Sequence, residues 1–142
     1  MRTIRIGFAL ALSLVLSGCL FDGALYEIDG RDHGIAVNRS QNWFWQDTVK
    51  LYLIASRMPE CLESRRIEDV PRTASVELYL PPQEYVEPIY IAEVNRTYYA
   101  ISTASCRVQP FAGQPDKLGQ HLGGFKELPD GRFEFVRAPT GG

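Results

Sequence analysis

The chain has 142 residues, of which 45% are hydrophobic and 23% charged, and this composition excludes a disordered or collagen-like protein. Its 15 basic and 17 acidic residues give a formal net charge of −2, without basic clusters. We therefore expect no nucleic acid partner, because affinity for nucleic acid depends on neutralising phosphates with Lys and Arg. The length predicts a single domain.

The first 18 residues have the pattern of an export signal. Arg2 and Arg5 form a short basic region, and residues 6–16 are an unbroken apolar run, IGFALALSLVL. A run of this length is typical of a secretory signal peptide, whereas a membrane-spanning helix needs about 20 apolar residues. We predict a cleaved signal peptide over residues 1–18, with an uncleaved membrane anchor as the alternative.

The end of this segment, Leu16-Ser17-Gly18-Cys19, resembles the lipobox of bacterial lipoproteins, in which Leu and small residues precede an invariant Cys. The resemblance covers residues 1–19 only. It implies cleavage before Cys19, attachment of a diacylglyceryl group to its thiol, acylation of its amine by a chain such as palmitate, and anchoring in a lipid bilayer. Leu20 is not the aspartate that retains many such proteins in the inner membrane. The resemblance therefore implies the periplasmic side of the outer membrane of a bacterial cell envelope.

The cysteine count supports this interpretation. The chain has three cysteines, an odd number for an exported protein. If Cys19 is lipidated, Cys61 and Cys106 remain as a pair that can form a disulfide in the oxidising periplasm. Such a bond would contribute about 4 kcal/mol in the chain-entropy model. The alternative, an ordinary secretory peptide cut after Gly18, leaves one cysteine without a role.

Removal of 18 residues from 142 leaves 124, and the loss of Arg2 and Arg5 leaves 13 basic and 17 acidic residues, a net charge of −4. We expect residues 19–23 to form a short lipidated tether. Residues 24–138 then form a single β-rich domain, and residues 139–142 a flexible tail.

From residue 24 onward, apolar and polar residues alternate as they do in half-buried β-strands. The predicted strands are residues 24–28, 34–38, 48–56, 74–80, 89–94, 97–103, 124–127 and 132–137. Turns are predicted at Asn95-Arg96 and at Leu128-Pro129-Asp130-Gly131. Only residues 59–69 indicate a short helix, with Pro59 near its first turn. The predicted fold class is mainly β: a small antiparallel sandwich, open barrel or meander with at most one short helix near 59–69.

The most unusual local feature is Trp43-Phe44-Trp45. We expect these rings to pack in the core, because each aromatic side chain buries about 150–250 Å² and a small domain needs that area. The alternative is an aromatic platform for a sugar, a peptide or a membrane interface. Trp43 and Trp45 are therefore candidate binding residues.

The sequence shows no metal, cofactor or catalytic motif. His33 and His121 are the only histidines and lie far apart, whereas a zinc site needs three or four clustered ligands. We interpret both as surface or turn residues, and we retain His121 as a candidate binding residue because it lies in a Gly- and Pro-rich segment, residues 110–124, that is expected to be a loop. Phosphate-binding loops and a nucleophile elbow are absent from the sequence.

These observations favour a membrane-anchored, non-catalytic binding or assembly accessory of the cell envelope, with an envelope protein or polymer as its partner. A membrane-tethered envelope enzyme and a purely structural envelope protein are the alternatives.

Overall fold

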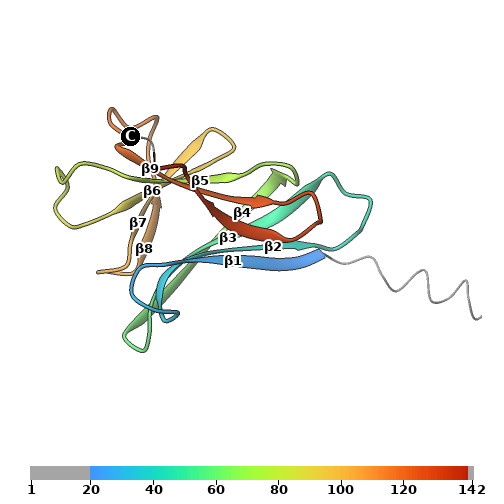
Figure 1. Ribbon diagram of the computed structural model, residues 1–142, viewed down its shortest axis with the longest axis horizontal. Coiled ribbons are helices and arrows are strands. Elements are labelled where there is room, and N and C mark those ends of the chain that lie inside the picture. The colour runs from blue at the N-terminus through green and yellow to red at the C-terminus, as the bar shows by residue number, and fades with distance from the viewer. Residues whose placement is uncertain (1–19, 141–142) are drawn as a thin grey trace, which may run out of the picture.

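The computed structural model describes residues 20–140, which form ten β-strands and no helix (Figure 1). The strands are β1 (Leu20–Glu27), β2 (His33–Gln41), β3 (Thr48–Arg57), β4 (Cys61–Pro71), β5 (Val76–Leu80), β6 (Tyr90–Val94), β7 (Thr97–Ser102), β8 (Arg107–Pro110), β9 (Gln120–Glu127) and β10 (Phe133–Arg137). The mainly β fold class is confirmed. Within residues 20–140 no helix is long and apolar enough to cross a membrane.

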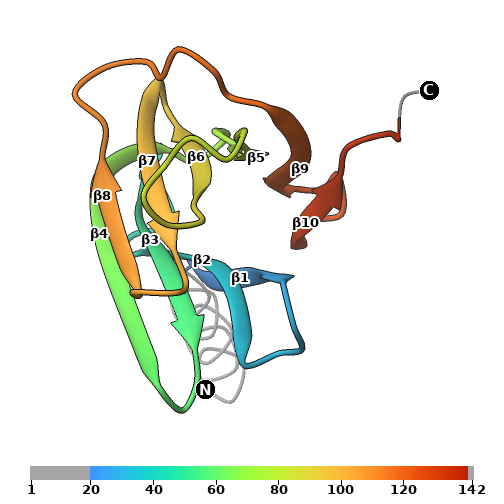
Figure 2. The ribbon, with the colours of Figure 1, turned by 90° about the vertical axis from the view of Figure 1, so that its left-hand side faces the viewer.

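The strands make two antiparallel sheets. The first has the strand order β1-β2-β3-β4, and the second has the order β10-β9-β5-β6-β7-β8, in which β9 returns to pair with β5. Figure 2 shows that the sheets adjoin at both edges, with β8 beside β4 and β10 beside β1. Within residues 20–140 the structure is thus two antiparallel sheets packed against each other, without a closed barrel.

One hydrophobic core lies between the sheets and follows from the alternation along the strands. In β3, Val49, Leu51, Leu53 and Ala55 are at most 3% exposed, as the sequence pattern predicts. The second sheet supplies the facing apolar side chains, which include Val76, Leu78, Val94, Ile101 and Phe125. Burial of a large apolar side chain contributes about 1.5–3 kcal/mol, so this alternation favours strands over any other local structure.

Both predicted turns are present. Asn95 and Arg96 have φ values of 46° and 68°, so the β6–β7 hairpin has two consecutive left-handed residues, as in a type I′ turn. Between β9 and β10, the amide of Gly131 donates to the carbonyl of Leu128 at 2.9 Å, and Gly131 has a φ of 89°. Only glycine adopts such a φ without a steric penalty.

The predicted helix over residues 59–69 is wrong, because this segment is β4. Its backbone pairs with β3 from Arg57 opposite Cys61 to Thr48 opposite Pro71. One extra residue of β4 forms a bulge near Asp69, whose φ is 54°. The many charged side chains suggested a solvated helix, but they fit an edge strand equally well, since an edge strand exposes much of its surface.

The predicted tether over residues 19–23 also needs correction. Leu20–Gly23 form the first half of β1 and pair with residues 38–41 of β2. Leu20 packs against the core, and Asp22 makes an ion pair with Arg39, so these residues belong to the folded domain. Of the predicted tail, residues 139–140 follow β10 and belong to no strand. Residues 141–142 lie outside the described residues.

Candidate functional site

A disulfide closes the edge at which β4 meets β8. Cys61, the first residue of β4, is bonded to Cys106, just before β8, with their Cα atoms 6.0 Å apart. The pairing predicted from the cysteine count is confirmed. Arg65 adds a contact across the same edge, because its Nη1 donates to the carbonyl of Val108 at 3.3 Å. The disulfide therefore fixes the β7–β8 turn against the first sheet.

Arg57, the last residue of β3, lies beside this disulfide. Its Nε donates to the carbonyl of Thr103 at 3.0 Å, and its Nη2 donates to the carbonyl of Ala104 at 3.0 Å. Both carbonyls belong to the turn that Cys106 holds in place. Arg57 takes part in none of the ion pairs formed within residues 20–140. Its guanidinium is thus oriented by backbone carbonyls and pairs with no carboxylate of the described residues.

A cavity of about 520 Å³ opens next to Arg57. Its lining residues come from five separate segments and are Ile28, His33, Arg57, Pro88, Tyr90, Thr103 and Ala104. The volume lies within the range of about 300–1,000 Å³ typical of small-molecule sites, which combine apolar walls with a few polar groups. We call this cavity the disulfide-end pocket.

The charge of the pocket lining is positive or zero. Arg57 supplies a positive charge, and His33 is the other basic side chain of the lining. Burial raises the pKa of the Tyr90 phenol, and the neighbouring Tyr26 adds to this effect, so Tyr90 is neutral at physiological pH. The walls of Ile28 and Pro88 are apolar. The pocket therefore complements an apolar group that carries an anionic end.

His33 and Thr103 form a hydrogen bond inside this pocket, with Nε2 and Oγ1 2.9 Å apart. A base beside a hydroxyl is also what a nucleophilic enzyme needs, together with a group that orients the base. None of the described residues that line the pocket is a carboxylate, and the Thr103 side chain is buried. The hydrogen bond holds the imidazole ring at the wall of the cavity.

His121 does not join this pocket. It is the second residue of β9, its Nε2 lies 2.7 Å from Oε2 of Glu77, and its ring packs against Tyr79 at 5.0 Å. Within residues 20–140, Trp43 and Trp45 stack on each other and Trp45 contacts Phe44, so the ring of His121 belongs to a different cluster. No group of three or more His, Cys, Asp or Glu within residues 20–140 has the geometry of a metal site.

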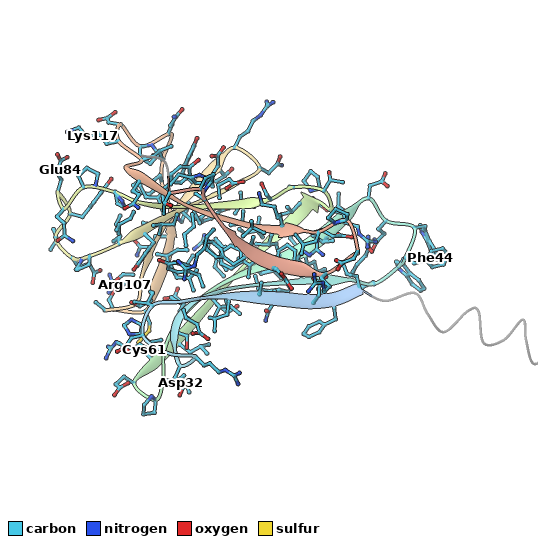
Figure 3. The ribbon with its side chains drawn as sticks, in the orientation of Figure 1. Asp32, Phe44, Cys61, Glu84, Arg107 and Lys117 are labelled. Atoms are coloured by element: carbon cyan, nitrogen blue, oxygen red, sulfur yellow. A yellow bond between two sulfur atoms is a disulfide. The ribbon has the colours of Figure 1, made fainter. Side chains whose placement is uncertain are left out.

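The expectation that Trp43, Phe44 and Trp45 pack in the core is wrong. Their exposed fractions are 55%, 66% and 64%. They lie in the turn between β2 and β3, beyond the end of the core, and Figure 3 shows Phe44 at the end of the molecule opposite Asp32 and Cys61. The two indoles stack on each other at 5.1 Å, and Phe44 meets Trp45 edge to face at 5.0 Å. We call residues 42–47 the aromatic tip.

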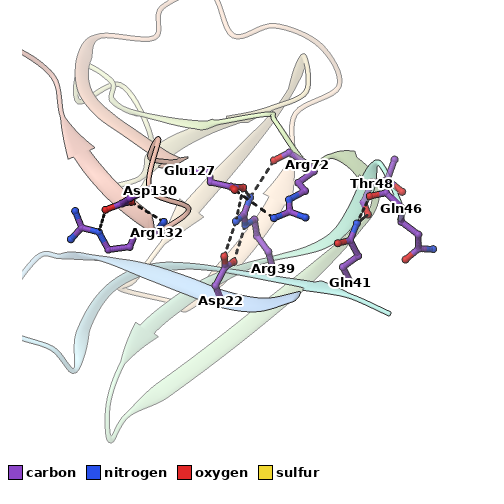
Figure 4. Close-up of polar contacts among 9 residues, drawn as sticks. All are labelled: Asp22, Arg39, Gln41, Gln46, Thr48, Arg72, Glu127, Asp130 and Arg132. Atoms are coloured by element: carbon purple, nitrogen blue, oxygen red, sulfur yellow. Dashed lines mark hydrogen bonds and ion pairs between the residues drawn. The ribbon is translucent and has the colours of Figure 1, made fainter. Parts of the chain in front are cut away.

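Arg39 in β2 connects the two sheets near the aromatic tip (Figure 4). Its guanidinium donates to both carboxylate oxygens of Asp22 at 2.9 and 2.7 Å and to Glu127 at 3.2 Å, and it lies 4.0 Å from the ring centre of Phe133. Burial opposes its charge, but the hydrogen bonds and charges of Asp22 and Glu127 outweigh this effect and raise the pKa of Arg39. These contacts hold β1, β2, β9 and β10 together.

The comparisons with known proteins add no assignment. No family model, no curated protein and no solved structure matches this chain. Cys19, the predicted lipidation site, lies outside the described residues. Sequence reasoning did not find Arg57 as a pocket residue, since its role depends on a turn 46 residues further along the chain.

Proposed function

We propose that the chain is a lipid-anchored, non-catalytic binding accessory of the bacterial cell envelope, held by acylated Cys19 on the periplasmic side of the outer membrane. The disulfide-end pocket is the observation on which the binding role rests. It lies at the end of the sandwich where β1 ends and β2 begins, whereas Leu20 lies at the other end of β1. A protein anchored at residue 19 would hold this pocket away from the bilayer and open to the periplasm.

The pocket supports binding of an apolar group with a carboxylate or a similar anion. Arg57 offers a fixed guanidinium, a group that recognises carboxylates in a planar, charge-assisted geometry. Ile28, Pro88 and Tyr90 provide the apolar wall. A fatty acid and the C-terminus of an envelope protein with an apolar last residue share this chemistry.

A titration with a small probe tests this role. The probe is 4-phenylbutyrate, its neutral control is 4-phenylbutanol, and the protein is the chain with Cys19→Ser, which keeps every pocket residue. We expect 4-phenylbutyrate to change the amide NMR signals of Arg57 and Thr103 in a saturable way and to bind about tenfold more tightly than the alcohol, which corresponds to about 1.4 kcal/mol.

The matched variants are Arg57→Gln and Arg132→Gln. Arg132 is 65% exposed and pairs with Asp130 and Glu134, so its loss should not alter binding. Arg57→Gln should remove the preference for the carboxylate. Equal affinity for the acid and the alcohol in the unmodified pocket, or an acid preference that survives Arg57→Gln, would contradict the proposal.

A further inference from the structure

The aromatic tip has a fixed shape. The side-chain amide of Gln41 donates to the carbonyls of Gln46 and Thr48, the latter at 3.1 Å (Figure 4). The backbone amide of Trp43 donates to Oε1 of Gln46 at 3.2 Å. Gln41 itself is only 4% exposed, so the loop is tied to a buried side chain. The stacked rings thus form a preorganised wedge.

The tip exposes a large apolar area and carries one charged side chain. Residues 42–46 read Asn-Trp-Phe-Trp-Gln and contain no ionisable side chain, and Asp47, which is exposed, follows them just before β3. Three adjacent aromatic residues that are each more than half exposed form an apolar patch, and contiguous patches of this kind mark interaction sites. Trp in particular is enriched at the interface of a lipid bilayer, because its ring is apolar and its N–H remains hydrated.

The position of the tip indicates what covers it. Leu20, the first described residue, pairs with Gln41, the residue at which β2 enters the tip. Cys19 immediately precedes Leu20, so residue 19 is one residue away from this end of the sandwich. Phe21, the next residue of β1, is 78% exposed and adds a further apolar ring to the same end.

We infer that the aromatic tip inserts into the interfacial layer of the bilayer in which Cys19 is anchored. This inference rests on the proposed lipid anchor and adds a second membrane contact to it. An acyl anchor alone lets a domain rotate about one point, whereas a second contact fixes its orientation. The disulfide-end pocket then faces away from the membrane. Because the tip has no Lys or Arg, insertion does not require anionic lipid.

A sugar platform fits the geometry less well. Such a platform presents flat, open ring faces, but the planes of Trp43 and Trp45 are inclined by only 19° and cover each other. Binding of a peptide or sugar to the tip is therefore an outcome of the test that would contradict insertion.

The experiment uses the natural fluorescence of the chain, because Trp43 and Trp45 are its only tryptophans. The mature acylated protein is reconstituted in phosphatidylcholine vesicles, with and without phosphatidylglycerol, and quenching by brominated phosphatidylcholine is measured. We expect blue-shifted emission and strong quenching by lipid brominated near the headgroup, equal in both lipid mixtures. Emission like that of water-exposed indole, quenched by aqueous iodide and not by brominated lipid, would overturn the inference.

Matched variants separate insertion from anchoring. Phe44→Asp should remove the blue shift and the lipid quenching while the protein still floats with the vesicles. Val86→Asp alters an even more exposed apolar residue, in the loop between β5 and β6, and should leave quenching unchanged. Unchanged thermal unfolding of both variants excludes misfolding as the cause.

The quenching measurement also tests insertion if Cys19 proves not to be acylated. If the purified mature chain carries no acyl group, the Cys19 thiol can be coupled to a maleimide lipid in the vesicles, since Cys61 and Cys106 are bonded to each other. Quenching in that sample supports insertion although the natural anchor is refuted. Absence of quenching in the same sample refutes insertion independently.

Discussion

At the scale of single residues, the most consequential side chain is Arg39. Only 1% of it is exposed, while its partners Asp22 and Glu127 are 23% and 28% exposed. Pairing of a buried charge rarely stabilises a protein more than apolar packing, but removal of one partner leaves charges unpaired and is costly. Arg39 is thus required for stability because, without it, the carboxylates of Asp22 and Glu127 lose their positively charged partner.

We therefore predict that Arg39→Met lowers the free energy of unfolding by about 2–4 kcal/mol, somewhat less than the roughly 3–5 kcal/mol typical of a broken buried pair, because both carboxylates retain contact with water. Urea unfolding measures this change. Arg132→Met is the control, since its ion pairs with Asp130 and Glu134 are exposed and should contribute less than about 0.5 kcal/mol. If both substitutions lowered the free energy of unfolding equally, the ion pairs of Arg39 would contribute no more to stability than the exposed ion pairs of Arg132.

Residue-scale predictions from the sequence differed in quality for a physical reason. Cys61 and Cys106 were identified correctly, because covalent pairing depends on cysteine number and redox compartment more than on local conformation. The location of Trp43 and Trp45 was predicted wrongly, because hydrophobicity argues for burial whereas their place in a turn between two strands prevents it.

At the scale of elements, the turn of the β6–β7 hairpin contains a residue with an unfavourable backbone conformation, which a substitution can relieve. Arg96 has a φ of 68°, a left-handed conformation that costs a residue with a Cβ about 1 kcal/mol. Glycine avoids that cost, and Asn-Gly is the preferred sequence of a type I′ turn.

Arg96→Gly should therefore stabilise the protein by about 0.5–1 kcal/mol, which calorimetry would detect as a higher melting temperature. Arg96→Ala keeps the Cβ and removes the same side-chain atoms beyond it, so it should give no such gain. If alanine stabilises as much as glycine, backbone conformation is not the cause.

The strand β4 shows where prediction of elements fails. Its sequence, CLESRRIEDVP, lacks the alternation seen in β3, and Val70 is the one residue of this strand that is buried. Pairing with β3 and the Cys61–Cys106 bond hold it in the sheet. The disulfide joins residues 45 positions apart, and the pairing with β3 depends on the turn over residues 58–60, so the periodicity of the β4 segment alone could not reveal either contact. The strands of regular alternation, such as β3 and β7, were predicted nearly to their ends.

At the scale of the whole molecule, the sandwich has two chemically different ends. The aromatic tip lies next to Leu20, and the disulfide-end pocket lies where β1 and β3 end. Neither the strand order nor this separation could be predicted from the sequence, because β9 pairs with β5 across about 40 residues of chain. Under the proposed lipid anchor at residue 19, the two ends would have different roles: membrane contact and ligand binding.

The central claim is the anchor on Cys19, and mass spectrometry of the mature N-terminus tests it most directly. We predict an N-terminal peptide that begins at Cys19, carries a diacylglyceryl group on the thiol and bears an acyl chain on the amine. An N-terminal peptide with unmodified Cys19, or one that retains residues 1–18, would contradict the account.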